Sequence, residues 1–526
     1  MKTFNRIINT VVSVVFVAGL TSCSDFLKEY SQDLAKVESW RDLDEVLLGD
    51  GYMHSARVIS KYSGSRPSAD GASDGLDILH FMADEFDMNR TDDYNDFCGY
   101  KYTMFPFYTW QQDTGIDYKL KYSGGDAAYW NNLYKHINVC NMVIYMIDEL
   151  TDDPDEEQKE RVKGEAYFLR GMYYFFLANL YAPPYDPESA SSAPGVPVKT
   201  SEIVEDTEFL RESLADTYRQ IISDFNEAAR LLEGKTAKSR YHADRTAALL
   251  MLSRVYLYMQ DWENAIDYAQ QVLAINSSLQ SISSVSPGES YVSISSPETI
   301  FSMGHYLIAS NFSDDDWGDY EPMFYVSEYM RNLYDDDDMR AGRYIGKTHS
   351  GFYSNVFLKY YMQYPVFGGY SDVSSYCLLR TPEAYLIAAE ANANKGADAP
   401  AREILGRFLS TRMSVMPDID GMSGNALIDF IREERAREFL LEGHRWFDLR
   451  RYTVCKPYPW SKVIEHEYMY YSMDYGKDLD YIDTYRLEKN DQAYTLPIPR
   501  EVREFQVSIG NNPRPARVAN REVIEE

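Results

Sequence analysis

The densest set of ionisable side chains in the sequence lies between Glu433 and Tyr452, where Arg and Glu recur at helical spacing. Arg435, Glu438 and Glu442 are three and four residues apart, so a helix would hold them along one face. Gly443 follows as a helix stop, and bulky aromatic residues come directly after it. A charge run of this kind is commonly a solvated helix face. The bulky aromatic residues after Gly443 instead favour a partly buried ion network that locks the last helix to the irregular half of the chain. The predicted members of this network are Arg435, Glu438, Glu442, Arg445 and Asp448.

Residue patterns typical of catalysis are absent from the sequence. The eight histidines show no HExxH or other paired metal spacing, and there is neither a GxSxG nor a phosphate-binding glycine loop. Carboxylates are so abundant that a glycosidase pair could be drawn almost anywhere, which makes any one pair uninformative. The sequence therefore predicts a protein that is not an enzyme, with a surface glycoside hydrolase as the alternative class.

Two acidic stretches could contact calcium. Asp335 to Asp338 is a run of four aspartates, and Asp418-Ile419-Asp420-Gly421 is a shorter candidate. Neither follows the twelve-residue ligand pattern of a calcium-binding loop. We therefore expect no cofactor and no metal site, and we leave bound calcium as an open alternative.

The net charge limits the class of partner. Lys and Arg total 52 and Asp and Glu total 82, which gives a formal net charge of −30. Such a surface repels nucleic acid and anionic lipid. The charge suits a neutral or cationic ligand.

The first residues are typical of an export signal. Lys2 and Arg6 precede an apolar run from Ile7 to Leu20 that is too short to span a membrane comfortably. Small residues follow, and then Cys23. The sequence predicts a signal peptide over residues 1–22.

The remaining cysteines are Cys98, Cys140, Cys377 and Cys455, which are far apart and without CxxC spacing. Export permits disulfides. Cys140 and Cys377 nevertheless lie in apolar segments, where a buried free thiol is the expected state.

Aromatic side chains gather in segments that lack a clear period. Residues 94–110 carry eight aromatics among Asp, Asn, Gly and Pro, and neither helical nor alternating spacing fits them. Such residues either fix a long loop to the core or present ring faces to a ligand.

Helical periodicity is clear in two blocks, at about 127–275 and about 378–443. Small residues at Ala247, Ser253 and Ala265 resemble the spacing of a tetratricopeptide hairpin. The regions between and around these blocks, about 62–126, 276–377 and 452–526, are rich in Tyr, Ser, Asp and Gly and are expected to be irregular. The predicted fold class is mainly α, with tetratricopeptide-like helical hairpins packed against a large irregular, loop-rich half.

Several motifs resemble those of the SusD/RagB family. They are Trp130-Asn131-Asn132-Leu133-Tyr134, Gly164-Glu165-Ala166 through Tyr173-Tyr174, Leu378-Leu379-Arg380 with Glu383-Ala384-Tyr385-Leu386, and Glu434-Arg435 through Glu442-Gly443 to Asp448-Leu449. In the same way, Leu20-Thr21-Ser22-Cys23 resembles a bacterial lipobox, which would leave Cys23 as the lipidated first residue.

The resemblance implies a single SusD-like domain over residues 23–526, a helical superhelix with variable irregular regions. It implies a non-catalytic lipoprotein on the outer face of the outer membrane, which captures an oligosaccharide or polysaccharide and delivers it to a SusC-like TonB-dependent transporter. A peptide is the alternative ligand on the same scaffold.

Aromatic faces stack on sugar rings, so the expected glycan contacts are aromatic residues outside the helical repeats. They are Tyr94, Tyr100, Tyr102, Tyr108, Trp110, Trp317, Tyr320 and Tyr325.

Overall fold

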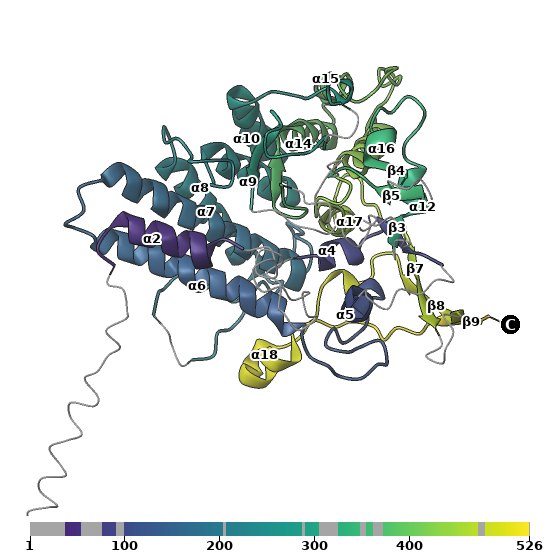
Figure 1. Ribbon diagram of the computed structural model, residues 1–526, viewed down its shortest axis with the longest axis horizontal. Helices are drawn as coiled ribbons and strands as arrows, with labels where there is room; N and C mark the ends of the chain where they lie inside the picture. Colours follow the sequence, from purple (N-terminus) through teal and green to yellow (C-terminus); the bar gives the residue numbers. More distant parts are fainter. Residues whose placement is uncertain are drawn as a thin grey trace, which may run out of the picture.

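The computed structural model describes residues 37–53, 76–90, 99–203, 207–286, 290–303, 324–347, 354–360, 372–471 and 479–524. The predicted signal peptide, the proposed lipidation site Cys23 and three of the expected glycan contacts, Tyr94, Trp317 and Tyr320, lie outside these residues. The described residues form a helical part and a part with short strands, and these two parts lie side by side in Figure 1.

The fold is mainly α, as the sequence predicts, and helices occupy both predicted blocks. From α6 to α10 and from α14 to α16, each helix packs on the next one in the chain, and α10 also packs on α14, which joins the two blocks (Figure 1). The first block contains α6 (Ala127–Glu149), α7 (Glu156–Tyr181), α8 (Leu214–Leu231), α9 (Arg245–Tyr258) and α10 (Trp262–Ile275). The second contains α14 (Thr381–Asn394), α15 (Asp398–Leu409), α16 (Gly424–Glu438) and α17 (Arg445–Thr453).

Side-chain caps fix where several of these helices begin. Asp155, Ser213, Asp244 and Asp261 each accept a hydrogen bond from a backbone N–H in the first turn of α7, α8, α9 and α10. A cap of this kind satisfies one of the backbone donors that a helix start leaves free. The sequence therefore specifies these starts locally.

Helix α14 is the centre of the helical part. All fourteen of its residues are buried, and it contacts α9, α10, α15 and α16. Its sequence is rich in alanine, and its buried carboxylates Glu383 and Glu390 are paired with Arg254 and Arg451, as a helix surrounded by others requires. The short helix α2 (Trp40–Val46) packs on α6 and α7 from outside (Figure 1).

Two segments that we expected to be irregular are regular. Gly99–Tyr108 forms the helix α5, although the residues show no helical period. Residues 452–526 contain a three-stranded antiparallel sheet, in the order β7 (Ile464–Tyr471), β8 (Leu479–Leu487) and β9 (Asn520–Val523). The helix and the sheet pack on each other. The ring of Phe105 in α5 makes edge-to-face contacts with the rings of Tyr468 in β7 and Tyr485 in β8, at centroid distances of 4.9 and 6.0 Å.

The described residues also form three further pairs of short strands, and two of these pairs, β1–β3 and β2–β6, join segments that are distant in the sequence. All three pairs are antiparallel. They are β1 (Phe86–Met88) with β3 (Phe324–Val326), β2 (Thr299–Ser302) with β6 (Leu378–Arg380), and β4 (Ile345–Lys347) with β5 (Ser354–Phe357).

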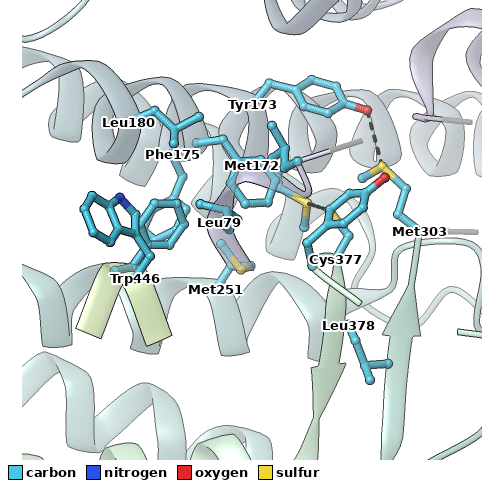
Figure 2. Close-up of a cluster of buried hydrophobic side chains, with 14 of the residues drawn as sticks. Leu79, Met172, Tyr173, Phe175, Leu180, Met251, Met303, Cys377, Leu378 and Trp446 are labelled. Atoms are coloured by element: carbon cyan, nitrogen blue, oxygen red, sulfur yellow. Dashed lines mark hydrogen bonds between the residues drawn. The ribbon is translucent and has the colours of Figure 1, made fainter. Parts of the chain in front are cut away.

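A shared hydrophobic core connects the helical part to the strands. Figure 2 shows Phe175 of α7 near Trp446 of α17, and Met172 of α7 near Cys377, which directly precedes β6. Cys377 Sγ lies 3.9 Å from Met172 Sδ. Cys140, Cys377 and Cys455 are buried free thiols, which confirms that expectation for Cys140 and Cys377.

The end of α16 differs from the expectation. The helix ends at Glu438, so Glu442 does not share its face with Arg435; instead it lies in a turn in which Leu441 and Gly443 have φ values of 57° and 76°. Tertiary contacts end the helix. Lys359 Nζ donates to the carbonyl oxygens of Glu438 and Leu440, at 2.6 and 3.2 Å, which satisfies acceptors that a helix end leaves free.

We expect Gly443→Ala to lower the free energy of unfolding by about 1–3 kcal/mol, because its φ of 76° disfavours any side chain. The added Cβ would also lie 2.9 Å from the Cα of Tyr376. Gly396→Ala is the matched control, since Gly396 has the same φ of 76° but open space around it. Chemical denaturation measures the loss of unfolding free energy in both variants, and the larger loss in Gly443→Ala gives the cost of the contact with Tyr376. Equal losses in the two variants would contradict this cost.

Candidate functional site

A cleft of about 710 Å³ lies where β1, the start of α12 (Glu328–Arg331) and the start of β7 meet. Its lining comes from three segments, at residues 84–90, 327–329 and 462–467, with Tyr108 and Thr484 behind them. Pairing of β1 with β3 positions the first two segments. Ser327 strengthens this connection, because its Oγ donates to the Asp84 carbonyl at 2.7 Å and its N–H donates to the Glu85 carbonyl at 2.9 Å.

The floor of the cleft is a buried ion cluster. Asp84 accepts two hydrogen bonds from Arg445, at 2.7 and 2.8 Å, and pairs with Lys462 as well. Burial alone would raise the pKa of Asp84, but the two cations hold it well below its usual range. The Lys462 ammonium lies 3.1 Å from the ring centroid of Tyr329, a cation–π contact. Lys462 and Tyr329 are therefore held in fixed positions at the cleft.

The walls of the cleft carry further charged groups. Arg90 donates two hydrogen bonds to Glu467, at 2.9 and 2.5 Å, and Glu465 lies 3.4 Å from Arg486. Asp87 Oδ2 accepts from the Glu328 backbone N–H at 2.9 Å. Hydroxyl-rich ligands fit such a wall, because carboxylate and guanidinium groups at a partly desolvated surface make strong directional hydrogen bonds.

Behind the cleft, His466 is buried between two aromatic rings. It stacks on Tyr108 and Trp110 at centroid distances of 4.1 and 4.3 Å, and its Nδ1 lies 2.6 Å from the Tyr108 carbonyl oxygen. Burial lowers the pKa of His466 to about 4, so the ring is neutral at physiological pH. This stack supports the back of the cleft and is inaccessible to a ligand.

Tyr108 and Trp110 therefore correct our expectation of glycan contacts. Their exposed fractions are 1% and 0%, and Trp110 Nε1 donates to the Met82 carbonyl at 2.9 Å. Both residues have the alternative role, which is to fix the 94–110 segment to the core. A sequence pattern cannot separate the two roles, because an anchoring ring and a ligand-binding ring are chemically the same.

The other expected aromatic contacts are placed as follows. Tyr102 is half-buried and lies 4.6 Å from Tyr118 between ring centroids. Tyr325 is also half-buried and stands opposite Asp87 in the β1–β3 register. Tyr100 lies in the first turn of α5. Of the described candidates, Tyr325 is therefore the one in register with a cleft residue.

Sequence reasoning missed Asp87, Tyr329 and Lys462. They lie in short segments separated by more than a hundred residues, and no local spacing connects them. The only available signal was the Ser327-Glu328 start of a short helix after a strand-like Phe324–Val326, which does not indicate a ligand.

The five residues predicted as one ion network occupy three neighbouring clusters. Glu438 accepts from Arg380, Arg412 and Arg340, at distances of 2.9 to 3.1 Å, and Glu442 pairs with Arg380. Arg435 makes a two-bond contact with Asp448, at 3.0 and 3.2 Å. Arg445 pairs with Asp84 in the cleft floor. All five side chains are buried, so the solvated-face alternative does not hold.

The acidic stretches proposed for calcium differ in exposure. Asp335 to Asp337 are exposed, and Asp338 is buried in an ion pair with Arg340 at 2.7 Å. Asp418 and Asp420 are exposed. Over the described ranges, no group of three or more His, Cys, Asp or Glu residues is arranged to hold a metal ion.

None of the helices in the described part of the chain is both long enough and apolar enough to cross a membrane. The architecture is that of a mainly helical protein with a polar, partly aromatic cleft beside its short strands. This combination is typical of proteins that bind a ligand in a cleft.

Comparison with known families narrows this class. Residues 79–257 match a family described as "Starch-binding associating with outer membrane", and residues 311–513 match one described as "SusD family". The chain belongs to the SusD/RagB family. A curated relative, the SusD-like protein P2 of Formosa agariphila, is 24% identical over 375 residues, which cover 62% of this chain and 72% of the relative.

Solved structures share the fold. A SusD superfamily protein from Bacteroides thetaiotaomicron is 21% identical with a TM-score of 0.66, and the match covers 90% of this chain and 100% of the other. A putative sugar binding protein from Bacteroides vulgatus is 22% identical with a TM-score of 0.65, and the match covers 91% and 99% of the two chains.

Proposed function

We propose that this protein is a non-catalytic nutrient-binding lipoprotein of the outer membrane, which captures an oligosaccharide and delivers it to a SusC-like TonB-dependent transporter. The observation that carries the proposal is the cleft beside Tyr329 in a chain of a family described as starch-binding. The cleft combines an aromatic wall with several hydrogen-bonding groups, and both features suit a polyhydroxylated ring.

The place of the protein in the cell is part of the same proposal. The family description includes association with the outer membrane. A lipid on Cys23 would attach the chain there, with thirteen residues between that cysteine and Val37, the first described residue. An anchored binder would keep its ligand close to a transporter in the same membrane.

A glycan array with the protein beginning at Ser24 tests the function. We expect binding to at least one neutral glycan and no release of reducing sugar from it. Binding to oligopeptides alone would favour the peptide alternative, and sugar release would favour the hydrolase. Either result would contradict the proposal.

Tyr329→Ala is expected to weaken glycan binding about 5- to 30-fold, equivalent to about 1–2 kcal/mol. The ring lines the cleft and also holds the Lys462 ammonium, and the variant removes both contributions. Isothermal titration calorimetry measures the change.

Two control variants accompany this measurement. Tyr329→Phe keeps the ring and should bind within about two-fold of the parent protein. Tyr145→Ala removes a tyrosine that is 47% exposed on α6 and should not alter binding. Full binding by Tyr329→Ala with an unchanged melting temperature would place the glycan elsewhere.

A further inference from the structure

The cations of the cleft are already engaged by carboxylates of the protein. Arg90 is held by two hydrogen bonds to Glu467. Lys462 is held by Asp84 below it and by the Tyr329 ring beside it. A ligand carboxylate or sulfate would have to compete with these contacts, because each cation already has an anionic partner.

Two carboxylates of the cleft, Asp87 and Glu328, have no salt-bridge partner among the described residues. They are held close together, since the backbone N–H of Glu328 donates to Asp87 Oδ2 at 2.9 Å. Arg331 is the cation on the same short helix, and its guanidinium donates to the Val326 carbonyl. The cleft therefore has a surplus of negative charge on one wall.

The titration of Asp87 is consistent with that surplus. Partial burial raises the pKa of Asp87, and the charges of Glu467 and Glu328 raise it further. The hydrogen bond from the Glu328 N–H and the charge of Arg331 lower the pKa of Asp87, but the net effect is still a raised pKa. A positive group placed in the cleft would relieve the repulsion between these carboxylates.

We infer that the cleft selects its ligand by charge, and that Asp87 and Glu328 determine this specificity. They favour an oligosaccharide that carries a protonated amine over its neutral N-acetylated counterpart, and they disfavour one that carries carboxylate or sulfate. The inference rests on the proposed function, because it assigns a ligand class to the same cleft.

The size of the effect follows from the exposure of the wall. Asp87 is exposed on the cleft side, so solvent screens part of its attraction for an amine. An exposed ion pair adds only a modest amount to the binding free energy. We therefore expect a gain of about five-fold in affinity for each carboxylate that contacts the amine. The gain should shrink in high salt.

Calorimetry with three probes of equal length tests this inference. The probes are a glucosamine tetramer, its fully N-acetylated form and a tetragalacturonate. We expect the glucosamine tetramer to bind at least about five-fold more tightly than the N-acetylated form at low salt. The difference should narrow in 0.5 M salt, and the tetragalacturonate should bind least.

Variants assign the effect to the two carboxylates. Asp87→Asn and Glu328→Gln should each lower the preference for the amine by about five-fold, measured in the same variant as the ratio of the affinities for the glucosamine tetramer and its N-acetylated form. Glu157→Gln is the matched control, since Glu157 is an exposed carboxylate in the first turn of α7. It should leave all three affinities unchanged.

Three results would overturn the inference. They are equal or weaker binding of the amine, binding of the uronate that matches the others, and an amine preference that is unchanged in both variants. Failure of all three probes, while a neutral glycan on the array binds, would also reject the amine preference and leave the proposed function in place. Absence of binding to any glycan would reject the proposed function itself.

Discussion

Glu438→Ala is expected to lower the free energy of unfolding by roughly 3–5 kcal/mol, one of the two largest single effects that we predict. Glu438 is fully buried and accepts hydrogen bonds from three guanidinium groups, those of Arg340, Arg380 and Arg412. Its removal leaves positive charges in the core that are only partly compensated by the remaining carboxylates. Chemical denaturation measures the loss.

The position of Glu438 explains why the effect should be global. Arg380 lies at the junction of β6 and α14, Arg412 follows α15, and Arg340 precedes the short helix α13 (Ala341–Tyr344). One carboxylate therefore connects the end of α16 to three other elements. Glu433→Ala is the control, because Glu433 is half-exposed on the same helix and should change stability by less than about 0.5 kcal/mol. A similar small change in Glu438→Ala would contradict the prediction.

Acid titration gives a second measurement of the same cluster. Burial would raise the pKa of Glu438, but Arg412 and Arg380 outweigh it and hold the pKa far below the ordinary value of 4.5. A carboxyl whose pKa is lowered by folding stabilises the protein fully above its unfolded pKa and loses that contribution as pH falls toward the folded pKa. The stability difference between the parent protein and Glu438→Gln should therefore narrow progressively below about pH 4.5.

Arg435→Ala is the second large effect, again expected at roughly 3–5 kcal/mol. The Arg435 guanidinium binds Asp448 through two hydrogen bonds and lies 3.5 Å from Glu390. Removing it leaves two buried carboxylates that share Arg451 as their remaining cation. Thermal and chemical denaturation should both report the loss.

Two comparisons make the Arg435 result specific. Arg435→Lys keeps the charge but loses the two-bond geometry, so it should recover only part of the stability. Arg407→Ala removes an arginine that is about two-thirds exposed on α15 and should be near neutral. An unchanged melting temperature in Arg435→Ala would mean that the side chain is exposed in solution.

The ion clusters also connect stability to the ligand cleft. Arg445, at the start of α17, binds Asp84, and Asp84 in turn holds Lys462 beside Tyr329. The same stretch of sequence that ends the second helical block therefore fixes the floor of the cleft. We therefore expect changes in this stretch to alter the proposed glycan binding without contacting the ligand.

Much of the helical part could be predicted from sequence because the signals are local. Apolar spacing and capping residues such as Asp155 and Asp244 act within one or two turns. The predicted block at 127–275 matches the span from α6 to α10, and α14 to α16 lie within 378–443, whereas α17 extends the second block to Thr453.

The failures came where distant contacts decide the structure. The tyrosine-rich strands β7 and β8 lack a clear alternating pattern, and Phe105 of the distant helix α5 packs on both of them. Glu442 was assigned to the α16 face, whereas Lys359 and Arg380 hold it in the turn beyond the helix end.

The sequence by itself determined the helical architecture, the membership in the SusD/RagB family and the set of charged residues near Gly443. Only the tertiary structure decided what those residues do. It buried Trp110 and Tyr108 and brought Asp87, Tyr329 and Lys462 into one cleft. The physical reason is that a helix is specified by residues within a few positions of each other, whereas burial and a binding cleft depend on contacts between segments hundreds of residues apart.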